Sequence, residues 1–252
     1  MEPPAYSYPP GLLVRVGRDL LLLRPRDFHA DAKSCIERRQ PPLRVLGSEN
    51  IPEQGPCVIT VNHYHRKGFR AEWLAMAVSA LVPVHVHWVI TSEHTQPATW
   101  YGPLAALFSR FLLKRIAHIY DFTTMPPMPP RTRDVEARAR SVRAVLKYVM
   151  RMQRPILGLA PEGYDPPGPS GVLTRPAPGV GRFGLLLARA GLRFIPVGVY
   201  ETGAEIQVHF GEPYLLSIPE GLSTDDKDER AILLIMQHIA RQLPSHLRGE
   251  FA

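Results

Sequence analysis

Apolar and polar positions along the chain follow two different periods, which alternate from residue 43 onward. Short, nearly continuous apolar runs are typical of buried strands, whereas apolar residues that recur every three or four positions are typical of helices. The runs predict strands at residues 43–46, 57–61, 84–90 and 156–160. The helical spacing predicts helices at residues 72–81, 103–117, 134–154 and 181–190, and from residue 224 onward. This alternation favours an α/β fold with a mostly parallel sheet.

Three further segments complete the predicted fold. Residues 194–200 and 206–210 flank Thr202-Gly203, which predicts an antiparallel hairpin and therefore a mixed sheet. Residues 116–122 predict another strand, and the four prolines of residues 123–131 predict a loop. Residues 24–42 are charged and lack a clear period, which indicates an irregular connection. We expect one α/β domain, residues 43–252, with a mixed, mostly parallel sheet flanked by helices.

Residues 1–42 precede this domain as a proline-rich tail and a short amphipathic segment. Leu12, Leu13, Val16 and Leu20 recur at helical spacing between arginines, which is typical of a helix at a membrane surface. A helix packed on the domain explains the same pattern equally well. The helix expected at residues 134–154 has a longer apolar stripe, which we expect to be buried; it consists of Val135, Ala139, Val142, Val145, Leu146 and Val149.

The composition narrows the classes of partner. A net charge of +7 favours anionic partners, but the scattered arginines match no nucleic-acid-binding motif, so a lipid surface is the better expectation. Two cysteines exclude a disulfide framework. His85 and His87 alternate along one predicted strand but have no third ligand near them in the sequence, so we expect no metal site.

The longest uncharged stretch, residues 73–92, has the length of a membrane span. Pro83 divides it, and the residues after Pro83 alternate as a strand does, so a helix followed by a strand is the better interpretation. The N-terminal residues do not resemble a signal peptide. We therefore expect a cytoplasmic protein at the periphery of a membrane.

Candidate catalytic residues follow two of the predicted strands. Asn62-His63 comes directly after the strand at residues 57–61, and Pro161-Glu162-Gly163 follows the strand at residues 156–160. The carboxyl ends of parallel strands meet at one edge of a sheet, where α/β proteins build their sites. Histidine accepts a proton near neutral pH, so the pattern indicates acyl-transfer or hydrolytic chemistry.

Together with the apolar run Ile195-Pro196-Val197, these blocks resemble the lysophospholipid/glycerolipid acyltransferase family (1-acylglycerol-3-phosphate acyltransferase-like). The resemblance implies transfer of an acyl chain from acyl-coenzyme A or acyl carrier protein, as co-substrate, to a lipid hydroxyl. It implies that His63 is the general base and that Asn62, Glu162 and Gly163 lie where the acceptor binds. No metal and no bound cofactor are implied.

The chain departs from the family pattern at several positions. Gly68 stands five residues after His63, where the family has the Asp that orients the imidazole, and we hypothesise that Glu72 replaces this acid. Pro161-Glu162-Gly163 continues as Tyr164-Asp165 instead of Thr-Arg, and Ile119-Tyr120-Asp121-Phe122 stands where the family carries an arginine.

Arg131 and Arg133 follow the proline-rich loop and would supply the missing positive charge for substrate binding, although two solvated loop residues explain them as well. Two alternative functions stay open. One is a protein that binds lipid or acyl thioester without turnover, and the other is a hydrolase of thioesters or lipid esters that uses the same His63.

Overall fold

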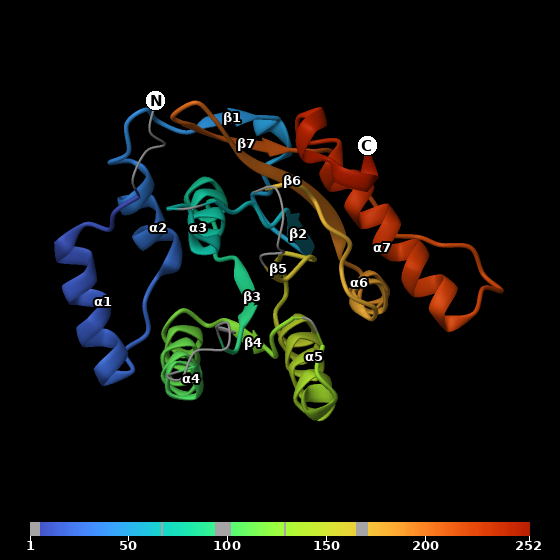
Figure 1. The fold of residues 1–252 in the computed structure, drawn as a ribbon, viewed down its shortest axis with the longest axis horizontal. Helices are drawn as coiled ribbons and strands as arrows, with labels where there is room; N and C mark the ends of the chain where they lie inside the picture. The colour runs from blue at the N-terminus through green and yellow to red at the C-terminus, as the bar shows by residue number, and fades with distance from the viewer. Residues whose placement is uncertain (1–5, 67, 94–101, 129, 165–170) are drawn as a thin grey trace.

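The described part of the chain, residues 6–66, 68–93, 102–128, 130–164 and 171–252 of a computed structural model, forms a seven-stranded sheet. The strands are β1 (Arg44–Leu46), β2 (Cys57–Val61), β3 (His87–Thr91), β4 (Thr123–Met125), β5 (Ile156–Leu159), β6 (Arg193–Thr202) and β7 (Glu205–Phe210). They lie in the order β1-β7-β6-β2-β5-β3-β4 (Figure 1). Every neighbouring pair is parallel except the hairpin β6–β7, so the predicted mixed, mostly parallel sheet is confirmed.

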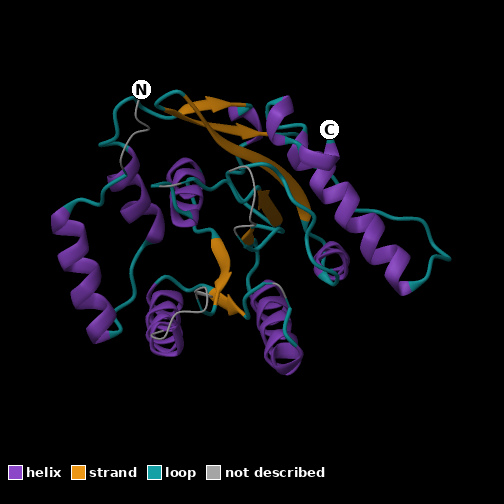
Figure 2. Cartoon of the chain, viewed as in Figure 1, coloured by secondary structure: helices purple, strands orange, loops and turns teal. Residues whose placement is uncertain are grey.

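Helices cover both faces of this sheet, as Figure 2 shows. The α-helices are α1 (Pro10–Leu22), α2 (Phe28–Ile36), α3 (Ala71–Leu81), α4 (Gly102–Ile119), α5 (Val135–Arg151), α6 (Val180–Arg189) and α7 (Thr224–Ala240). Four short 3-10 helices accompany them in the described residues: η1 (Ser48–Asn50), η2 (Thr132–Asp134), η3 (Ser245–Leu247) and η4 (Gly249–Phe251). In Figure 1, α1–α4 lie on one side of the strands and α5–α7 on the other.

The central strand β2 is buried along its whole length and contributes to both hydrophobic cores. Cys57, Ile59 and Val61 belong to the core that includes α2 and α3, whereas Val58 belongs to the core formed with α5, α6 and α7. Successive side chains of a strand point to opposite faces, so a strand between two helical layers buries side chains on both faces and favours apolar residues, with Thr60 as the polar member of β2. This is why the run at residues 57–61 is continuous rather than alternating.

The expectation of an irregular connection at residues 24–42 is wrong, because α2 lies within it. Asp27 begins this helix, and its carboxylate accepts hydrogen bonds from the main-chain N–H groups of His29 and Ala30. An N-cap of this kind satisfies donors that the first turn leaves unpaired. The helix packs on α3, and Ala32, Cys35 and Ile36 are buried there. The charged residues of this segment masked its helical period.

The strand expected at residues 116–122 is also wrong. Helix α4 continues to Ile119, and the strand follows it as β4, inside the segment predicted to be a loop. β4 is short and lies at the edge of the sheet, paired only with β3. Proline lacks the N–H that pairs strands, so the proline-rich residues from Pro126 onward end β4 at Met125. They do not prevent the three residues before them from pairing with β3.

The apolar stripe of α5 is buried only in part, contrary to prediction. Val145 and Val149 are buried together with Tyr148, whereas Val135 is 63% exposed and Ala139 is also exposed. The C-terminal half of the helix packs against the sheet, so the first two turns of the stripe remain at the surface. Among the described residues, no helix is both long and apolar enough to cross a membrane.

Asn62 binds the end of β2 to β6 through its side chain. Its Nδ2 donates to the carbonyl of Val199 at 2.9 Å, and its Oδ1 accepts from the N–H of Val199 at 2.7 Å. The side chain is completely buried. The amide therefore continues the ladder between β2 and β6 for one more residue and fixes the direction in which the chain leaves the sheet toward His63.

We predict that Asn62→Ala lowers the free energy of unfolding by about 1–3 kcal/mol, because both polar groups of Val199 would stay buried without partners. Denaturant unfolding measures the change. Asn50→Ala is the matched control, since the Asn50 amide makes a single bond to Phe210 at 3.2 Å from a partly exposed position. Equal losses in the two variants would contradict this account.

Candidate functional site

The carboxyl ends of β2 and β5 bring His63 and Glu162 into direct contact. The strands pair in parallel with Thr60 opposite Leu159, so the residues that follow them leave the sheet at the same edge. The main-chain N–H of His63 donates to Oε2 of Glu162 at 2.6 Å. The two blocks predicted to meet at this edge of the sheet therefore do so, although 99 positions separate them in the sequence.

Glu162 is buried, with only 2% of its surface exposed. Its second oxygen, Oε1, accepts hydrogen bonds from the N–H of Thr174 at 2.8 Å and from the Thr174 hydroxyl at 3.2 Å. Burial raises the pKa of this carboxyl group, and the hydrogen bonds from His63 and Thr174 act in the opposite direction. The carboxylate thus joins the end of β2 to the loop before α6, which is a positioning role.

Thr174 is a residue that sequence reasoning missed. The chain reads Thr174-Arg175, and residues 164–173 separate this pair from Gly163. The pair is the signal that could have been found, because the family pattern places Thr-Arg directly after Glu-Gly. Arg175 itself forms ion pairs with Glu229 and Glu250, the latter at 3.4 Å. Asp165, which stands where the family has that arginine, lies outside the described residues.

Gly163 makes the turn after Glu162 with φ 71°, a left-handed conformation that side chains disfavour. A Cβ atom at this position would also lie 2.8 Å from Cγ of Met128. Both constraints require glycine here. The turn therefore brings the chain close to the segment after β4, and it borders a cavity.

The cavity lies at the carboxyl ends of β3 and β5 and has a volume of about 160 Å³. Its floor includes Thr60, three residues before His63, and its wall includes Gly163, next to Glu162. The remaining lining is largely apolar and includes Val89, Met125, Pro127, Met128, Val142, Val180, Phe183 and Phe194. Such a lining suits a hydrocarbon chain better than a polar ligand.

Arg138 of α5 is the basic side chain in the wall of this cavity. Its Nη2 donates to the carbonyl of Pro127 at 3.0 Å, and Nη1 lies 3.4 Å from the sulfur of Met128. Burial lowers the pKa of the guanidinium, which nevertheless stays charged at neutral pH. Arg138 lies outside the apolar stripe of α5, and the path of residues 125–128 brings it to the cavity.

The loop after His63 is fastened to the end of β6 by Glu201. Its carboxylate forms an ion pair with Arg66 and accepts hydrogen bonds from the hydroxyls of Tyr64, at 3.3 Å, and Tyr6. His63 itself is partly exposed. The chain is therefore held on both sides of His63, by Asn62 before it and by Glu201 after it.

Glu72 lies in the first turn of α3, as expected. Its Oε1 accepts a hydrogen bond from the Tyr8 hydroxyl at 3.0 Å and lies 2.9 Å from Nε of Arg70. Tyr8 also stacks on Trp73, with ring centroids 5.1 Å apart. These contacts join the N-terminal segment to α3. The hypothesis that Glu72 orients His63 stays a prediction.

Arg131 and Arg133 occupy different environments. Arg131 lies 2.5 Å from the buried carboxylate of Glu93 and forms a second ion pair with Asp134, and Arg110 also pairs with Glu93. Arg131 is therefore already neutralised by two carboxylates. Arg133 is exposed in η2. Residues 119–122, where the family carries an arginine, lie before β4 at the opposite, amino edge of the sheet.

Comparison with known proteins gives a likeness in fold. No protein-family model matches the chain, and no curated protein sequence matches it. The crystal structure of the 1-acyl-sn-glycerophosphate (LPA) acyltransferase PlsC from Thermotoga maritima is similar, with a TM-score of 0.55 and 13% sequence identity. The similarity covers 96% of this chain and 91% of that one. The chain thus has the α/β fold of that protein over nearly its whole length.

Proposed function

We propose that this protein transfers an acyl chain from an acyl thioester to a hydroxyl of a glycerolipid-like acceptor at a membrane surface, with His63 as general base. The observation that carries the proposal is the 2.6 Å hydrogen bond from His63 to Glu162, which joins the two candidate blocks beside an apolar cavity. The likeness in fold to the PlsC acyltransferase adds support. The thioester donor is acyl-coenzyme A or acyl carrier protein.

In the proposed reaction, the imidazole of His63 takes the proton of the acceptor hydroxyl while the hydroxyl oxygen attacks the thioester carbon. The carbon–sulfur bond then breaks, and the leaving thiolate takes the proton from His63. The acyl chain remains attached to the acceptor as an ester. Asn62 and Glu162 act as positioning residues, because Asn62 holds the end of β2 against β6 and Glu162 binds the main-chain N–H of His63.

The acyl chain would occupy the apolar cavity, with its thioester end toward Thr60 and Gly163. Burial of each methylene contributes about 0.8 kcal/mol. Arg138 lies in the wall and is the candidate contact for a polar or anionic group of the bound lipid. Arg138 thus takes the substrate-binding role expected of Arg131, because the charge of Arg131 is neutralised by Glu93 and Asp134.

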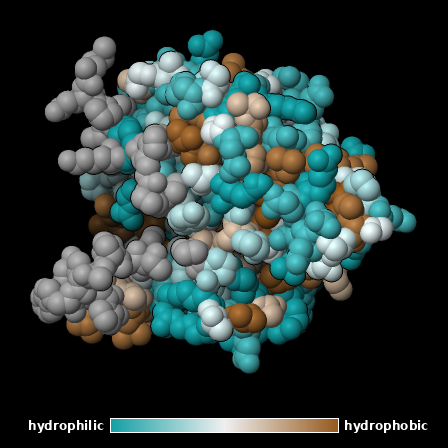
Figure 3. Space-filling model, turned by 45° about the vertical axis from the view of Figure 1, so that its right-hand side comes forward, coloured by the Kyte–Doolittle hydropathy of each residue, from teal (hydrophilic) through white to brown (hydrophobic). Residues whose placement is uncertain are grey.

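The proposed membrane-contacting surface, here called the apolar face, is formed by neighbouring parts of α1 and α4. Its exposed side chains are Leu13, Val14, Leu21, Leu22, Leu23, Leu104, Leu107, Phe108 and Phe111. Arg115 of α4 joins the two helices by donating to the carbonyls of Leu20 and Leu21 at 2.5 and 3.1 Å. On the face that Figure 3 shows, hydrophilic residues predominate.

Basic side chains accompany the apolar face. Arg15, Arg18 and Arg24 are exposed in or after α1, and Lys114 is exposed on α4. Each basic residue near an anionic lipid surface contributes about 1 kcal/mol to binding. The combination fits a helix pair that lies on the membrane rather than one that crosses it.

We predict that His63→Ala lowers acyl transfer about 10²- to 10⁴-fold, because the acceptor hydroxyl loses its base. The assay follows thiol release from palmitoyl-coenzyme A with a panel of lysophospholipid, monoacylglycerol and glycolipid acceptors. His246→Ala, which changes an exposed histidine of η3, is the control and should keep full activity. Thiol release without any acceptor would indicate a hydrolase, and thioester binding without turnover would indicate a binding protein.

The same assay tests Glu72 as the acid that orients His63. Loss of an orienting carboxylate costs up to about 10⁴-fold in hydrolase triads. A Glu72→Gln protein that keeps its transfer rate would exclude this role for Glu72 and leave His63 as the base.

For the cavity, we predict that Val142→Phe lowers kcat/KM for long acyl donors about tenfold relative to short ones, since the added ring fills space that the chain needs. A series of acyl-coenzyme A donors of increasing length measures the preference. Val135→Phe is the matched control, because Val135 lies on the same helix, is 63% exposed and does not line the cavity. An unchanged chain-length profile in Val142→Phe would place the acyl chain elsewhere.

For the apolar face, we predict that the double variant Leu107→Glu/Phe111→Glu reduces co-sedimentation with phosphatidylglycerol vesicles severalfold at low salt, since two carboxylates would enter the lipid contact. Met150→Glu is the control, because Met150 is 79% exposed on α5, outside the apolar face. Equal pelleting of the two proteins would count against this surface.

A further inference from the structure

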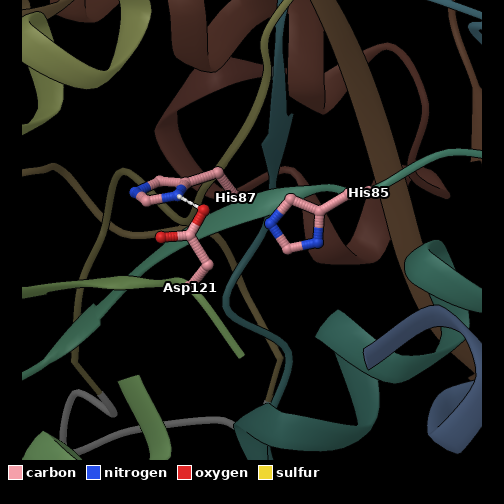
Figure 4. A group of neighbouring side chains, drawn as sticks. All are labelled: His85, His87 and Asp121. Atoms are coloured by element: carbon pink, nitrogen blue, oxygen red, sulfur yellow. Dashed lines mark ion pairs between the residues drawn. The ribbon is translucent and has the colours of Figure 1, made fainter. Parts of the chain in front are cut away.

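Two histidines and an aspartate gather at the amino edge of the sheet, as Figure 4 shows. His85 and His87 lie immediately before and at the start of β3, and Asp121 lies between α4 and β4. One ligand atom from each of the three residues lies within 4.8 Å of the others. No third ligand stands near the two histidines in the sequence, but parallel pairing of β3 with β4 brings Asp121 to them.

His87 has the features of a prepared ligand. It is 2% exposed, its ring stacks on Tyr148 with centroids 3.7 Å apart, and Nε2 lies 2.8 Å from the hydroxyl of Thr123. In the tautomer that donates from Nε2–H to Thr123, the lone pair lies on Nδ1. Within the described residues, Nδ1 is buried without a hydrogen-bond partner and lies 4.0 Å from Oδ2 of Asp121. Asp121 is thus at ion-pair distance from Nδ1 but too far away for a hydrogen bond, which leaves room for a ligand between the two groups.

The other two ligands have freedom to adjust. His85 and Asp121 are exposed, and His85 also borders an open depression formed with Pro25, Asp27 and His29, which gives solvent access. Asp121 has φ 51°, a left-handed conformation that turns the chain from α4 toward β4. Tetrahedral zinc with ligands at 2.0–2.2 Å needs ligand atoms about 3.3 Å apart, so rotation of the two exposed side chains would complete the geometry.

We propose that His85, His87 and Asp121 bind Zn²⁺, with a water molecule as fourth ligand. Two imidazoles and one carboxylate suit zinc, whereas Mg²⁺ and Ca²⁺ prefer oxygen ligands. The hydrogen bond from His87 to Thr123 is the support that metal-ligating histidines usually have. The ion would join the start of β3 to the turn before β4, and it would stabilise the edge of the sheet opposite the proposed catalytic site.

The local charges agree with this assignment. Burial lowers the pKa of His87 to about 4; Asp121 opposes this shift, whereas His85 and Arg151 act in the same direction. The ring is therefore neutral at pH 7, as a metal ligand must be. Arg151 is exposed, so solvent screens its repulsion of a cation.

Isothermal titration of the full-length protein with ZnCl₂ tests the proposal. We expect one Zn²⁺ per chain, and we expect His85→Ala and Asp121→Asn each to weaken binding about tenfold or more; Thr123→Val should weaken it about 10- to 100-fold. His85 and Asp121 are exposed, so we expect both variants to fold, and weaker Zn²⁺ binding would then not result from unfolding. Circular dichroism of each variant checks that it is folded. The midpoint of thermal unfolding should rise with Zn²⁺ in the wild-type protein and should rise less, or not at all, in His85→Ala and Asp121→Asn.

The chain has ten histidines, so a control must show that loss of an unrelated histidine leaves Zn²⁺ binding unchanged. His246→Ala is that control, and it should bind Zn²⁺ as the wild type does. Absence of stoichiometric binding would overturn the proposal, as would equal affinity in wild type, His85→Ala and Asp121→Asn. The result is independent of the proposed acyl transfer, because the cluster lies at the other edge of the sheet.

Discussion

The buried carboxylate of Glu162 is the interaction on which the candidate site depends. Removing a carboxylate from water is costly unless donors replace the lost hydration, and Glu162 receives three hydrogen bonds from His63 and Thr174. Two of these donors are main-chain N–H groups. The Glu162 carboxylate therefore fixes the path of the backbone at the end of β2 and before α6. The positions of the side chains on these two segments depend on that path.

A second set of polar contacts joins the end of β2 to the neighbouring strand β6. The Asn62 amide pairs with both polar groups of Val199, and the loop beyond His63 is held by Arg66 and Glu201. His63 is thus supported from two segments that lie far from it in the sequence, the Glu162 turn and the end of β6. This arrangement places a partly exposed imidazole at the rim of the sheet, which is the property that general-base chemistry requires.

The two edges of the sheet carry different kinds of chemistry. The carboxyl edge combines His63, the Glu162 turn and an apolar cavity, which suits a hydrophobic substrate with one reactive group. The amino edge carries the cluster of His85, His87 and Asp121. Helices α1 and α4 add an exposed apolar face beside the domain. A parallel sheet readily allows the proposed acyl transfer at one edge and the proposed metal site at the other, because its strand ends are far apart.

The sequence by itself determined the elements whose pattern is local: β2, α3, the β6–β7 hairpin and α7 follow from apolar period and turn residues. It also placed His63 and Glu162 at strand ends, and parallel pairing then made their meeting predictable. The sequence did not predict α2, because its main local signal is the single N-cap residue Asp27. It also did not predict the α4–β4 junction, because a three-residue strand followed by prolines carries a weak signal. Tertiary structure alone decided the partners of distant side chains. Thr174 reaches Glu162, Arg138 reaches the cavity, and Asp121 reaches His87, because the sheet order, which local periodicity does not encode, brings their segments together.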